Sequence, residues 1–297
     1  RGMTTIEIFE RGIVRSIPSS WDEMSPEQVR FVIRTYDDCV RRGRSPLEFS
    51  VRVLYHLLGM THNWRSVRWE RLYPELVAER DANIFMLCEK CLGFLFSGDD
   101  VAQLTFSATA NPLPSVRSAF YRRRLIGPAD LLQDLTFGEF RHATTALNAF
   151  FKSQSIGDLD ECIAFLYRAR SKNPNRAGRY VLPVSNATFD RDVRRAARLP
   201  FWQKNLIMLW FAACVNYLQT GIVFINGEEI DMSQLFSKEE PRQSDAYTWN
   251  DLLIQIAKEQ TIGNIERVDD EPLFSILSIM WHNLKERRRD EKIRKTH

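Results

Sequence analysis

The amino-acid sequence predicts a mainly α-helical fold: a multi-helix bundle around a buried central helix at about residues 203–220, with one or two small β-hairpins. Between Leu206 and Leu218 only Asn216 is strongly polar, and a helix that is apolar on every side has to be enclosed by other elements or by lipid. The run is shorter than the ~20 residues that cross a bilayer, so we expect enclosure by protein and no membrane contact. Recurring helix-start signals and two turn signals support the helices and the hairpins.

The composition is that of an ordinary globular protein, with 44% hydrophobic and 27% charged residues in a chain of 297. This length suits one large domain or two smaller ones. The formal net charge of +3 requires no polyanionic partner. Arginine supplies 32 of the 41 basic residues, and its planar guanidinium suits carboxylates, phosphates and aromatic faces. The five cysteines, with no recognisable signal peptide, lead us to expect reduced thiols in a cytoplasm.

The first predicted region, residues 1–100, is helical. It opens with a stretch at 4–17 that alternates enough for a short strand or an extended arm. A Ser-Pro pair at 25–26, with Gln28 completing a capping box, predicts the first helix, and a second Ser-Pro pair at 45–46 predicts another. Both helices carry an apolar stripe and end at glycine, so we expect an antiparallel helical hairpin.

A longer helix is predicted from Pro74 to about Phe96, after a segment at 60–73 that is expected to form a short helix or a packed loop. Apolar residues recur along this helix at three- and four-residue spacing, which is typical of a face turned toward the core. The residues expected to face inward are Leu76, Val77, Ile84, Leu87, Cys88, Cys91, Leu92 and Leu95.

The second predicted region, residues 101–236, combines a strand insertion with the helices that surround the central helix. Alternation on both sides of a turn at 111–114 predicts a strand pair over about 104–120. The dipeptide Asn226-Gly227 lies between apolar residues and predicts a second hairpin. A loop is the alternative at this place, because the second arm is acidic and poor in strand-forming residues.

Three further helices are predicted in the same region. Thr136 and Glu139 form a capping box that begins a helix running to Phe151. Asp158 is expected to cap a short helix after it, and a basic helix follows at about 187–198. The apolar stripes of the first two are expected to surround the central helix.

The third predicted region, residues 247–297, is a helical hairpin with a basic tail, which follows a polar linker at 237–246. Its helices are expected at about 248–258 and from Pro272 onward. The tail from Lys285 holds seven basic and three acidic residues.

No stretch carries a recognisable catalytic or cofactor-binding motif, so we expect a non-enzymatic protein with no cofactor and no metal. Cys88 and Cys91 form a CxxC, but one such pair supplies two of the four ligands that zinc needs, and in a helix both share the apolar inward face. Adjacent carboxylates such as Asp37-Asp38 diverge in direction and are expected to cap helices or face solvent. His56 and His142 are expected to be ordinary helix residues.

Charge is distributed unevenly along the chain. From Arg168 to Arg198 nine basic residues stand against two acidic ones, whereas residues 221–271 hold four basic and twelve acidic residues. We predict that one arginine stripe of this basic segment and the arginines of the tail form an interaction surface. Its members are Arg191, Arg194, Arg195, Arg198, Arg287, Arg288 and Arg289.

Two interpretations of the arginine stripe stay open. It binds phosphate, with an affinity that falls steeply in salt, or it pairs with the acidic segment of this chain or of a neighbouring copy. We favour pairing, because no recognition helix or cluster of stacking aromatic residues accompanies the stripe. A positive and a negative face on one molecule also suit head-to-tail assembly.

Three stretches resemble a known group of proteins. They are TFSATANPLPSV at 105–116, GPADLLQDLTFGEFRHA at 127–143 and LDECIAFLYRA at 159–169. In this succession the chain resembles uncharacterised helical proteins encoded in the structural-gene regions of tailed phages and prophages of Bacteroidetes. Residues 249–286, a helix, a glycine turn and a helix with a charged end, are similar in layout to the hairpins of phage tail assembly proteins.

The resemblance implies a role in virion assembly or at the phage tail, in the cytoplasm of a bacterial host or in the virion, and it implies no catalytic residues. We therefore predict a non-enzymatic phage-type structural or tail-assembly protein that acts on protein partners, either copies of itself or other phage structural proteins. The alternative is a nucleic-acid-binding accessory protein of a mobile element, which uses the segment Arg168–Arg198 on phosphates. Salt-sensitive binding to random DNA distinguishes the two.

Overall fold

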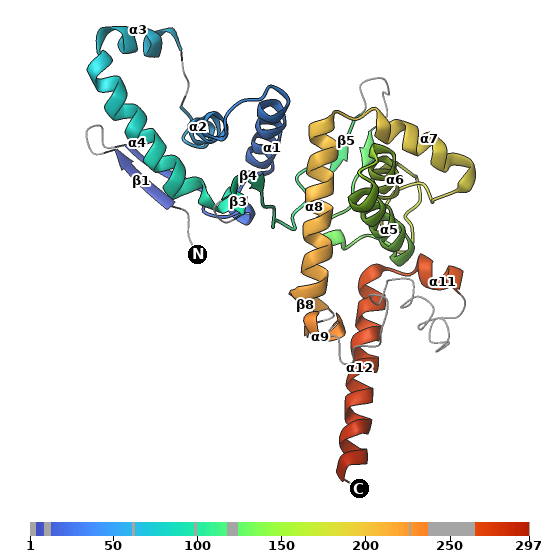
Figure 1. The fold of residues 1–297 in the computed structure, drawn as a ribbon. Coiled ribbons are helices and arrows are strands. Elements are labelled where there is room, and N and C mark those ends of the chain that lie inside the picture. Colours follow the sequence, from blue (N-terminus) through green and yellow to red (C-terminus); the bar gives the residue numbers. More distant parts are fainter. Residues whose placement is uncertain are drawn as a thin grey trace. The chain divides into compact units, whose positions relative to one another are not determined.

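The computed structural model describes residues 4–8, 13–60, 63–97, 100–117, 124–225, 227–236 and 265–296. Helices account for most of these residues, and the strands form small antiparallel sheets (Figure 1). The mainly α-helical fold with small hairpins is therefore confirmed. The chain forms two compact units, one of Arg1–Ala108 with Phe201–Leu206 and one of Thr109–Pro200 with Ile207–His297. The division into three regions that the sequence predicts stays a prediction.

In the first unit a run of helices lies between two short strand pairs along the chain. Its elements are β1 (Thr4–Ile8), β2 (Ile13–Ile17), α1 (Pro26–Arg41), α2 (Pro46–Leu57), α3 (Trp64–Leu72), α4 (Pro74–Leu92), β3 (Phe96–Ser97) and β4 (Asp100–Leu104). β1 pairs antiparallel with β2, from Thr4 opposite Ile17 to Ile8 opposite Ile13. The segment predicted as one strand or an arm is thus a hairpin. The segment for which a short helix or a packed loop is expected contains α3.

The helix-start signals of α1 and α2 are confirmed by their capping bonds. The Ser25 hydroxyl accepts a hydrogen bond from the Gln28 amide at 3.2 Å, and the Gln28 side chain accepts one from the Ser25 amide at 2.8 Å. The Ser45 hydroxyl accepts from the Glu48 amide at 3.2 Å. These bonds satisfy amides that the first turn of a helix leaves without a partner. Each helix then buries one apolar face, with Val29, Val32, Ile33 and Cys39 in α1 and Phe49, Val53, Leu54 and Leu57 in α2.

The predicted inward face of α4 is confirmed in the last turns and is only partly covered before them, where Val77, Ile84 and Leu87 are half-buried. Leu76 is 42% exposed, and burial begins only at Cys88 and continues through Cys91 and Leu92. Apolar periodicity defines a face, but it does not guarantee that another element covers that face. In α4 the first turns remain open to solvent.

The second unit combines a small sheet, in the order β5-β6-β7, with helices and a strand hairpin. Its elements are β5 (Ser115–Val116), β6 (Leu125–Ile126), α5 (Phe137–Ser153), α6 (Ile156–Leu166), β7 (Arg168–Ala169), α7 (Asn186–Ala197), α8 (Phe201–Thr220), β8 (Ile222–Ile225), β9 (Glu228–Asp231), α9 (Ser233–Phe236), α11 (Ile265–Asp270) and α12 (Leu273–Thr296). Phe201–Leu206 of α8 belong to the first unit. β8 pairs with β9 across Gly227, whose φ is +81°, so the Asn-Gly hairpin is confirmed.

The strand pair predicted over 104–120 is wrong. β4 pairs with β3, and β5 pairs with β6. Asn111 holds the segment between them: its side chain donates to the Pro128 carbonyl at 2.6 Å and accepts from the Leu113 amide at 2.8 Å. The two prolines of this turn have no amide hydrogen to give to a strand ladder. The prediction that Asp158 caps α6 is also wrong, because the N-cap is Ser155.

α8 is the buried central helix that the apolar stretch predicts. Its most deeply buried side chains are Leu206, Trp210, Phe211, Cys214 and Leu218. The Trp210 indole donates to the Thr109 carbonyl at 3.0 Å, and the Phe211 ring meets Phe140 of α5 edge-on, with ring centroids 6.1 Å apart. The far side of the helix, at Met208, is half-buried.

α11 and the start of α12 attach to the start of α5. Backbone hydrogen bonds of 2.8 and 2.9 Å join the two segments, and the Arg141 guanidinium donates to the Asp269 carboxylate at 2.7 and 3.2 Å. A Cβ at Gly138 would lie 2.8 Å from the Asp269 Cβ, so this close approach requires glycine. The predicted linker at 237–246 and the predicted helix at 248–258 lie outside the described residues.

Candidate functional site

All five cysteines are buried and form no disulfide. Burial raises the pKa of the Cys88 thiol to about 11 and also raises the pKa of Cys91, because a buried thiolate loses its hydration. The thiolate is the form that attacks substrates and binds metals. The CxxC of α4 therefore acts as apolar core, in agreement with its predicted place on the inward face.

His56 and His142 each stack on an aromatic ring. The centroid of His56 lies 3.6 Å from that of Phe31, and the centroid of His142 lies 5.2 Å from that of Phe165. Burial is the main cause that lowers the pKa of both imidazoles. Within the described ranges, no three His, Cys, Asp or Glu side chains gather in a way that could hold a metal ion.

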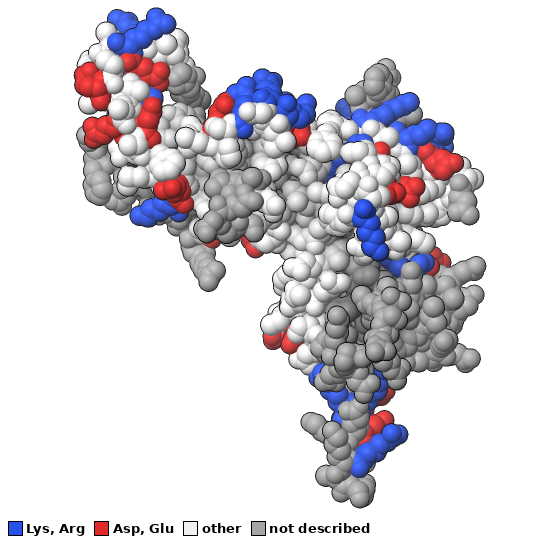
Figure 2. Space-filling model, in the orientation of Figure 1, with Lys and Arg blue, Asp and Glu red and all other residues white. Residues whose placement is uncertain are grey.

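The predicted arginine stripe lies along α7 and at its end, where basic side chains reach the surface (Figure 2). Arg191 and Arg194 are exposed and form no ion pair with any described residue. Arg195 is half-buried and pairs with Asp192 of the same helix at 2.8 Å. Arg198 follows the helix as its C-cap residue and is exposed. The helix thus brings the four arginines together, and one of them, Arg195, forms an ion pair with a carboxylate of the same helix.

The three arginines of the tail lie on α12 and do not share a face. Arg287 and Arg289 are exposed, whereas Arg288 is half-buried and donates to the Gln234 side chain at 2.6 Å. Consecutive residues of a helix point in directions about 100° apart. These arginines therefore form no common stripe.

Two other arginines of the basic segment are buried structural residues. Arg168 and Arg179 are 2% and 3% exposed. Arg168 donates to the Glu139 carboxylate, and Arg179 lies 3.6 Å from the other carboxylate oxygen. Burial is the main cause that lowers the pKa of Arg168 to about 9 and of Arg179 to about 10, so both stay charged at neutral pH. Arg176 pairs with Glu271, in the acidic segment, at 2.5 Å.

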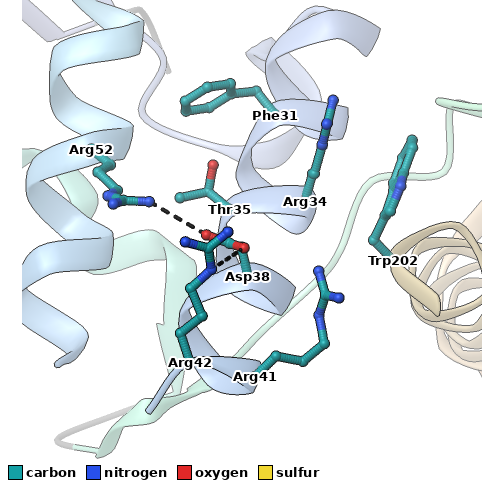
Figure 3. A pocket seen from close by; sticks show the side chains of 8 residues that line it. All are labelled: Phe31, Arg34, Thr35, Asp38, Arg41, Arg42, Arg52 and Trp202. Atoms are coloured by element: carbon teal, nitrogen blue, oxygen red, sulfur yellow. Dashed lines mark ion pairs between the residues drawn. The ribbon is translucent and has the colours of Figure 1, made fainter. Parts of the chain in front are cut away.

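A cleft in the first unit gathers a different set of arginines (Figure 3). Its volume is about 580 Å³, within the ~300–1,000 Å³ typical of small-molecule sites. α1 supplies most of the lining, because residues three, four and seven apart share one face of a helix. The lining residues, which we call the arginine cleft, are Phe31, Arg34, Thr35, Asp38, Arg41, Arg42, Arg52 and Trp202.

Carboxylates orient three of the four arginines in the cleft. Asp38 lies 2.9 Å from Nε of Arg42 and 3.6 Å from Nη1 of Arg52, as the dashed lines of Figure 3 mark. Asp37, whose side chain is 4% exposed, lies 3.1 Å from Nε of Arg41. The closest contacts of Arg41 and Arg42 use Nε, so one edge of each guanidinium is engaged.

The cleft keeps an excess of positive charge. Four guanidinium groups and one carboxylate line it. Asp37 and Glu48 pair with Arg41 and Arg52 from outside the lining, and even with both counted one positive charge remains. Arg34 is exposed and has no ion-pair partner in the part of the chain that the structure describes. Figure 2 shows basic side chains gathered over α1.

The arginine cleft does not stand out in the sequence. One signal exists, because Arg34 and Arg41 are seven residues apart and so lie on one face of a helix. Residues 30–52, however, hold six basic and three acidic residues, a weaker imbalance than that of the basic segment. Arg52 joins the cleft only because α2 packs beside α1.

α3 and α4 expose many large apolar side chains. α3 has no buried residue, and the buried residues of α4 all lie in its last turns. The exposed set, which we call the hairpin surface, is Trp64, Trp69, Leu72, Tyr73, Leu76, Phe85 and Met86. Large exposed apolar areas of this kind mark interaction sites on soluble proteins.

Contacts between α3 and α4 hold these two helices together as a helical hairpin. Arg80 of α4 lies 2.6 Å from the carboxylate of Glu70 in α3 and 5.9 Å from the ring centroid of Trp69. Hydrogen bonds to Glu70 and to its neighbour Asp81 raise the pKa of Arg80. Leu76 and Phe85 are nine residues apart, about two and a half turns. They therefore lie on opposite sides of α4, and the hairpin is apolar on more than one side.

Comparison with known proteins assigns no role to these surfaces, because no family model, no curated protein and no solved structure matches the chain. Among the described helices, none is both long and apolar enough to cross a membrane. Function is therefore inferred from the chemistry of the surfaces themselves.

Proposed function

We propose that this protein is a non-enzymatic structural or assembly protein of the phage or prophage type, which acts through contacts with other protein subunits. The hairpin surface carries the proposal. A helix that is apolar on more than one side gains stability when another protein encloses it, and Trp and Tyr often dominate protein interfaces. The phage context rests on the resemblance of the stretches at 105–116, 127–143 and 159–169 to structural-region proteins of tailed phages.

The use of reactive side chains in packing supports the non-enzymatic part of the proposal. Cys88 and Cys91 are buried thiols with a raised pKa. His56 and His142 are occupied in aromatic stacks. A nucleophile or general base needs the opposite situation, with an accessible group whose pKa is tuned toward the working pH.

The proposed partners are phage structural subunits, including copies of this chain, in the host cytoplasm or in the virion. The hairpin β8–β9 offers a complementary surface for a copy. α3 carries basic residues among its aromatic ones, whereas Phe224 of β8 is 71% exposed and faces the acidic Glu229 across the strands. Contact between the hairpin surface of one copy and β8–β9 of the next is heterologous, and it builds rings or filaments.

Light scattering after size-exclusion chromatography, over a range of protein concentrations, tests this proposal. The parent protein is expected to increase in mass with concentration. Two variants test the two sides of the contact: the α3 variant, which combines Trp64→Ser with Leu72→Ser, and the single variant Phe224→Ser. Each is expected to weaken association by about tenfold or more, because one buried aromatic anchor contributes ~2 kcal/mol or more. Tyr180→Ser is the matched control, since Tyr180 is 53% exposed and lies outside both surfaces.

Two results bear on the proposal in different ways. Loss of association in the α3 variant but not in Phe224→Ser keeps the hairpin surface as a contact between copies and removes β8–β9 as its partner. A parent protein that is monomeric at every concentration, and that copurifies with no structural protein encoded beside it, contradicts the proposal.

Nucleic-acid binding by the basic segment has less support. Arg168 and Arg179 are buried with Glu139, and Arg195 pairs within its own helix. The segment therefore offers fewer accessible guanidinium groups than its sequence contains.

A further inference from the structure

We infer that the arginine cleft of the first unit is a binding site for a nucleoside phosphate, with the phosphate on the guanidinium groups of α1 and the base against an aromatic side chain. Three features support this inference: the excess of arginine over carboxylate on the walls, the aromatic residues at the sides, and a volume of about 580 Å³. The inference is independent of the assembly role, because it uses none of the residues of the hairpin surface.

The phosphate end of the site consists of Arg34, Arg41 and Arg42. Arg34 is exposed and has no ion pair with any residue in the described ranges. Arg41 and Arg42 are oriented by carboxylates at Nε, 3.1 and 2.9 Å away, so their side chains are ordered before a ligand arrives. Such preorganisation lowers the entropic cost of binding. The planar guanidinium fork matches two oxygens of a phosphate.

Two aromatic side chains of the lining, Phe31 and Trp202, are available to the base. Figure 3 shows the two rings on different sides of Arg34. One face of Phe31 is occupied by the His56 imidazole, whose centroid is 3.6 Å away at an angle of 9° between the planes. This stack fixes the phenyl ring. Stacking of a base on an aromatic side chain is tolerant of base identity, so the site is expected to show little preference among bases.

A nucleotide fits the cleft better than an acidic peptide does. Peptide carboxylates would use the arginines but would leave Phe31 and Trp202 without a role. The one carboxylate of the lining, Asp38, already contacts Arg42 and Arg52, which reduces its repulsion of an incoming phosphate. Free nucleotides and single-stranded nucleic acid present the same chemistry, and competition between the two distinguishes them.

Fluorescence anisotropy with a fluorescein-labelled single-stranded oligonucleotide at low salt tests the inference. Arg34→Ala combined with Arg41→Ala is expected to weaken binding by about tenfold or more, and to reduce the slope of log K against log salt by roughly 1.4, because two phosphate contacts are lost. Arg41→Ala leaves the Asp37 carboxylate, whose side chain is 4% exposed, without this partner, so circular dichroism checks the fold of the double variant. Arg34→Ala alone breaks no ion pair among the described residues, and it is expected to reduce the slope by roughly 0.7 while weakening binding severalfold.

The matched control is Arg191→Ala combined with Arg194→Ala, which removes the same charge from exposed positions on α7. Its affinity is expected to stay within about twofold of the parent, because the loss of two surface charges outside the cleft changes only the overall electrostatic field. Equal affinity of the parent and the cleft variant overturns the inference. So does a loss of binding confined to the α7 variant, or the absence of binding to any probe.

Competition identifies the ligand. Displacement by ATP indicates a free-nucleotide site, whereas displacement only by unlabelled oligonucleotide indicates a strand; both results support the inference. Trp202→Ala is expected to weaken ATP binding by about tenfold while leaving pyrophosphate binding unchanged, because only ATP carries a base to stack. Displacement by polyglutamate but not by pyrophosphate assigns the cleft to an acidic peptide and overturns the inference.

Discussion

Glu139 in the second unit and Glu48 in the first occupy the same position in their helices and differ in burial. Each is the third residue after an N-cap hydroxyl, and each lies between two arginines. The partners are Arg168 and Arg179 for Glu139, and Arg44 and Arg52 for Glu48. The Glu139 side chain is 5% exposed and that of Glu48 is 39% exposed.

The difference shows that access of water, not local pattern, decides what an arginine–glutamate cluster does. A buried charge loses its hydration and becomes very costly if its partner is removed. A charge at the surface is screened and contributes little to stability. The cluster around Glu139 is therefore expected to stabilise the fold. The cluster around Glu48 borders the arginine cleft and leaves guanidinium groups available to a ligand.

Replacement of Glu139 by Ala is expected to have the largest effect. It leaves two guanidinium groups buried without this carboxylate, and Arg179 keeps a contact with Asp134 at 4.0 Å. Removal of one partner from a buried ion pair costs ~3–5 kcal/mol. The free energy of unfolding, measured by urea titration with circular dichroism, is expected to fall by about that amount.

Glu139→Gln is the control for this variant, because an amide oxygen can still accept from the Thr136 amide, now 3.3 Å from the carboxylate, but carries no charge. The free energy of unfolding of Glu139→Gln is expected to lie between that of the parent and that of Glu139→Ala. A loss below about 1 kcal/mol in the Ala variant would mean that water reaches the cluster.

Arg141→Ala is expected to have an intermediate effect, since the pair that it forms with Asp269 is 13% and 22% exposed. Hydrogen bonds to charged groups contribute ~1.5–3 kcal/mol, and the free energy of unfolding should fall by about that amount. Hydrogen exchange should accelerate at the amides of α11, which this pair attaches to α5, and stay unchanged in the middle of α5.

Arg176→Ala is the matched control at the same junction, because Arg176 contacts Glu271 but is 51% exposed. Its effect is expected to stay below about 1 kcal/mol. Equal losses in the free energy of unfolding for the two variants would show that exposure does not determine how much each ion pair contributes to stability.

The sequence predicts the starts of α2 and α5, because a helix-start signal depends on residues within one turn. It also predicts the central helix, where apolar residues cover every side. Burial and distant partners are not predictable in this way. Arg168 is 29 residues from Glu139 along the chain, and it lies in β7, which pairs with β6.

The wrong strand pair and the unrecognised arginine cleft have the same origin, because both depend on contacts between segments that are apart in the sequence. The strand pair over 104–120 fails because β5 pairs with β6 rather than with β4, and strand pairing depends on tertiary context. The arginine stripe of α7 is visible in the sequence because all its members belong to one short segment. The arginine cleft is not, because it needs Arg52 from a second helix.

Glu48→Ala is expected to have the smallest effect, and it tests the comparison most directly. It removes the same group from the same helical position as Glu139→Ala, but at a site open to water. The loss of the surface pairs and of the favourable charge near the helix N-terminus amounts to about 1 kcal/mol or less. In about 1 M salt the Debye length falls to ~3 Å, so the difference between variant and parent, measured by urea unfolding, should shrink further. A loss as large as that of Glu139→Ala at either salt concentration would mean that the position in the helix, and not burial, sets the strength of these clusters.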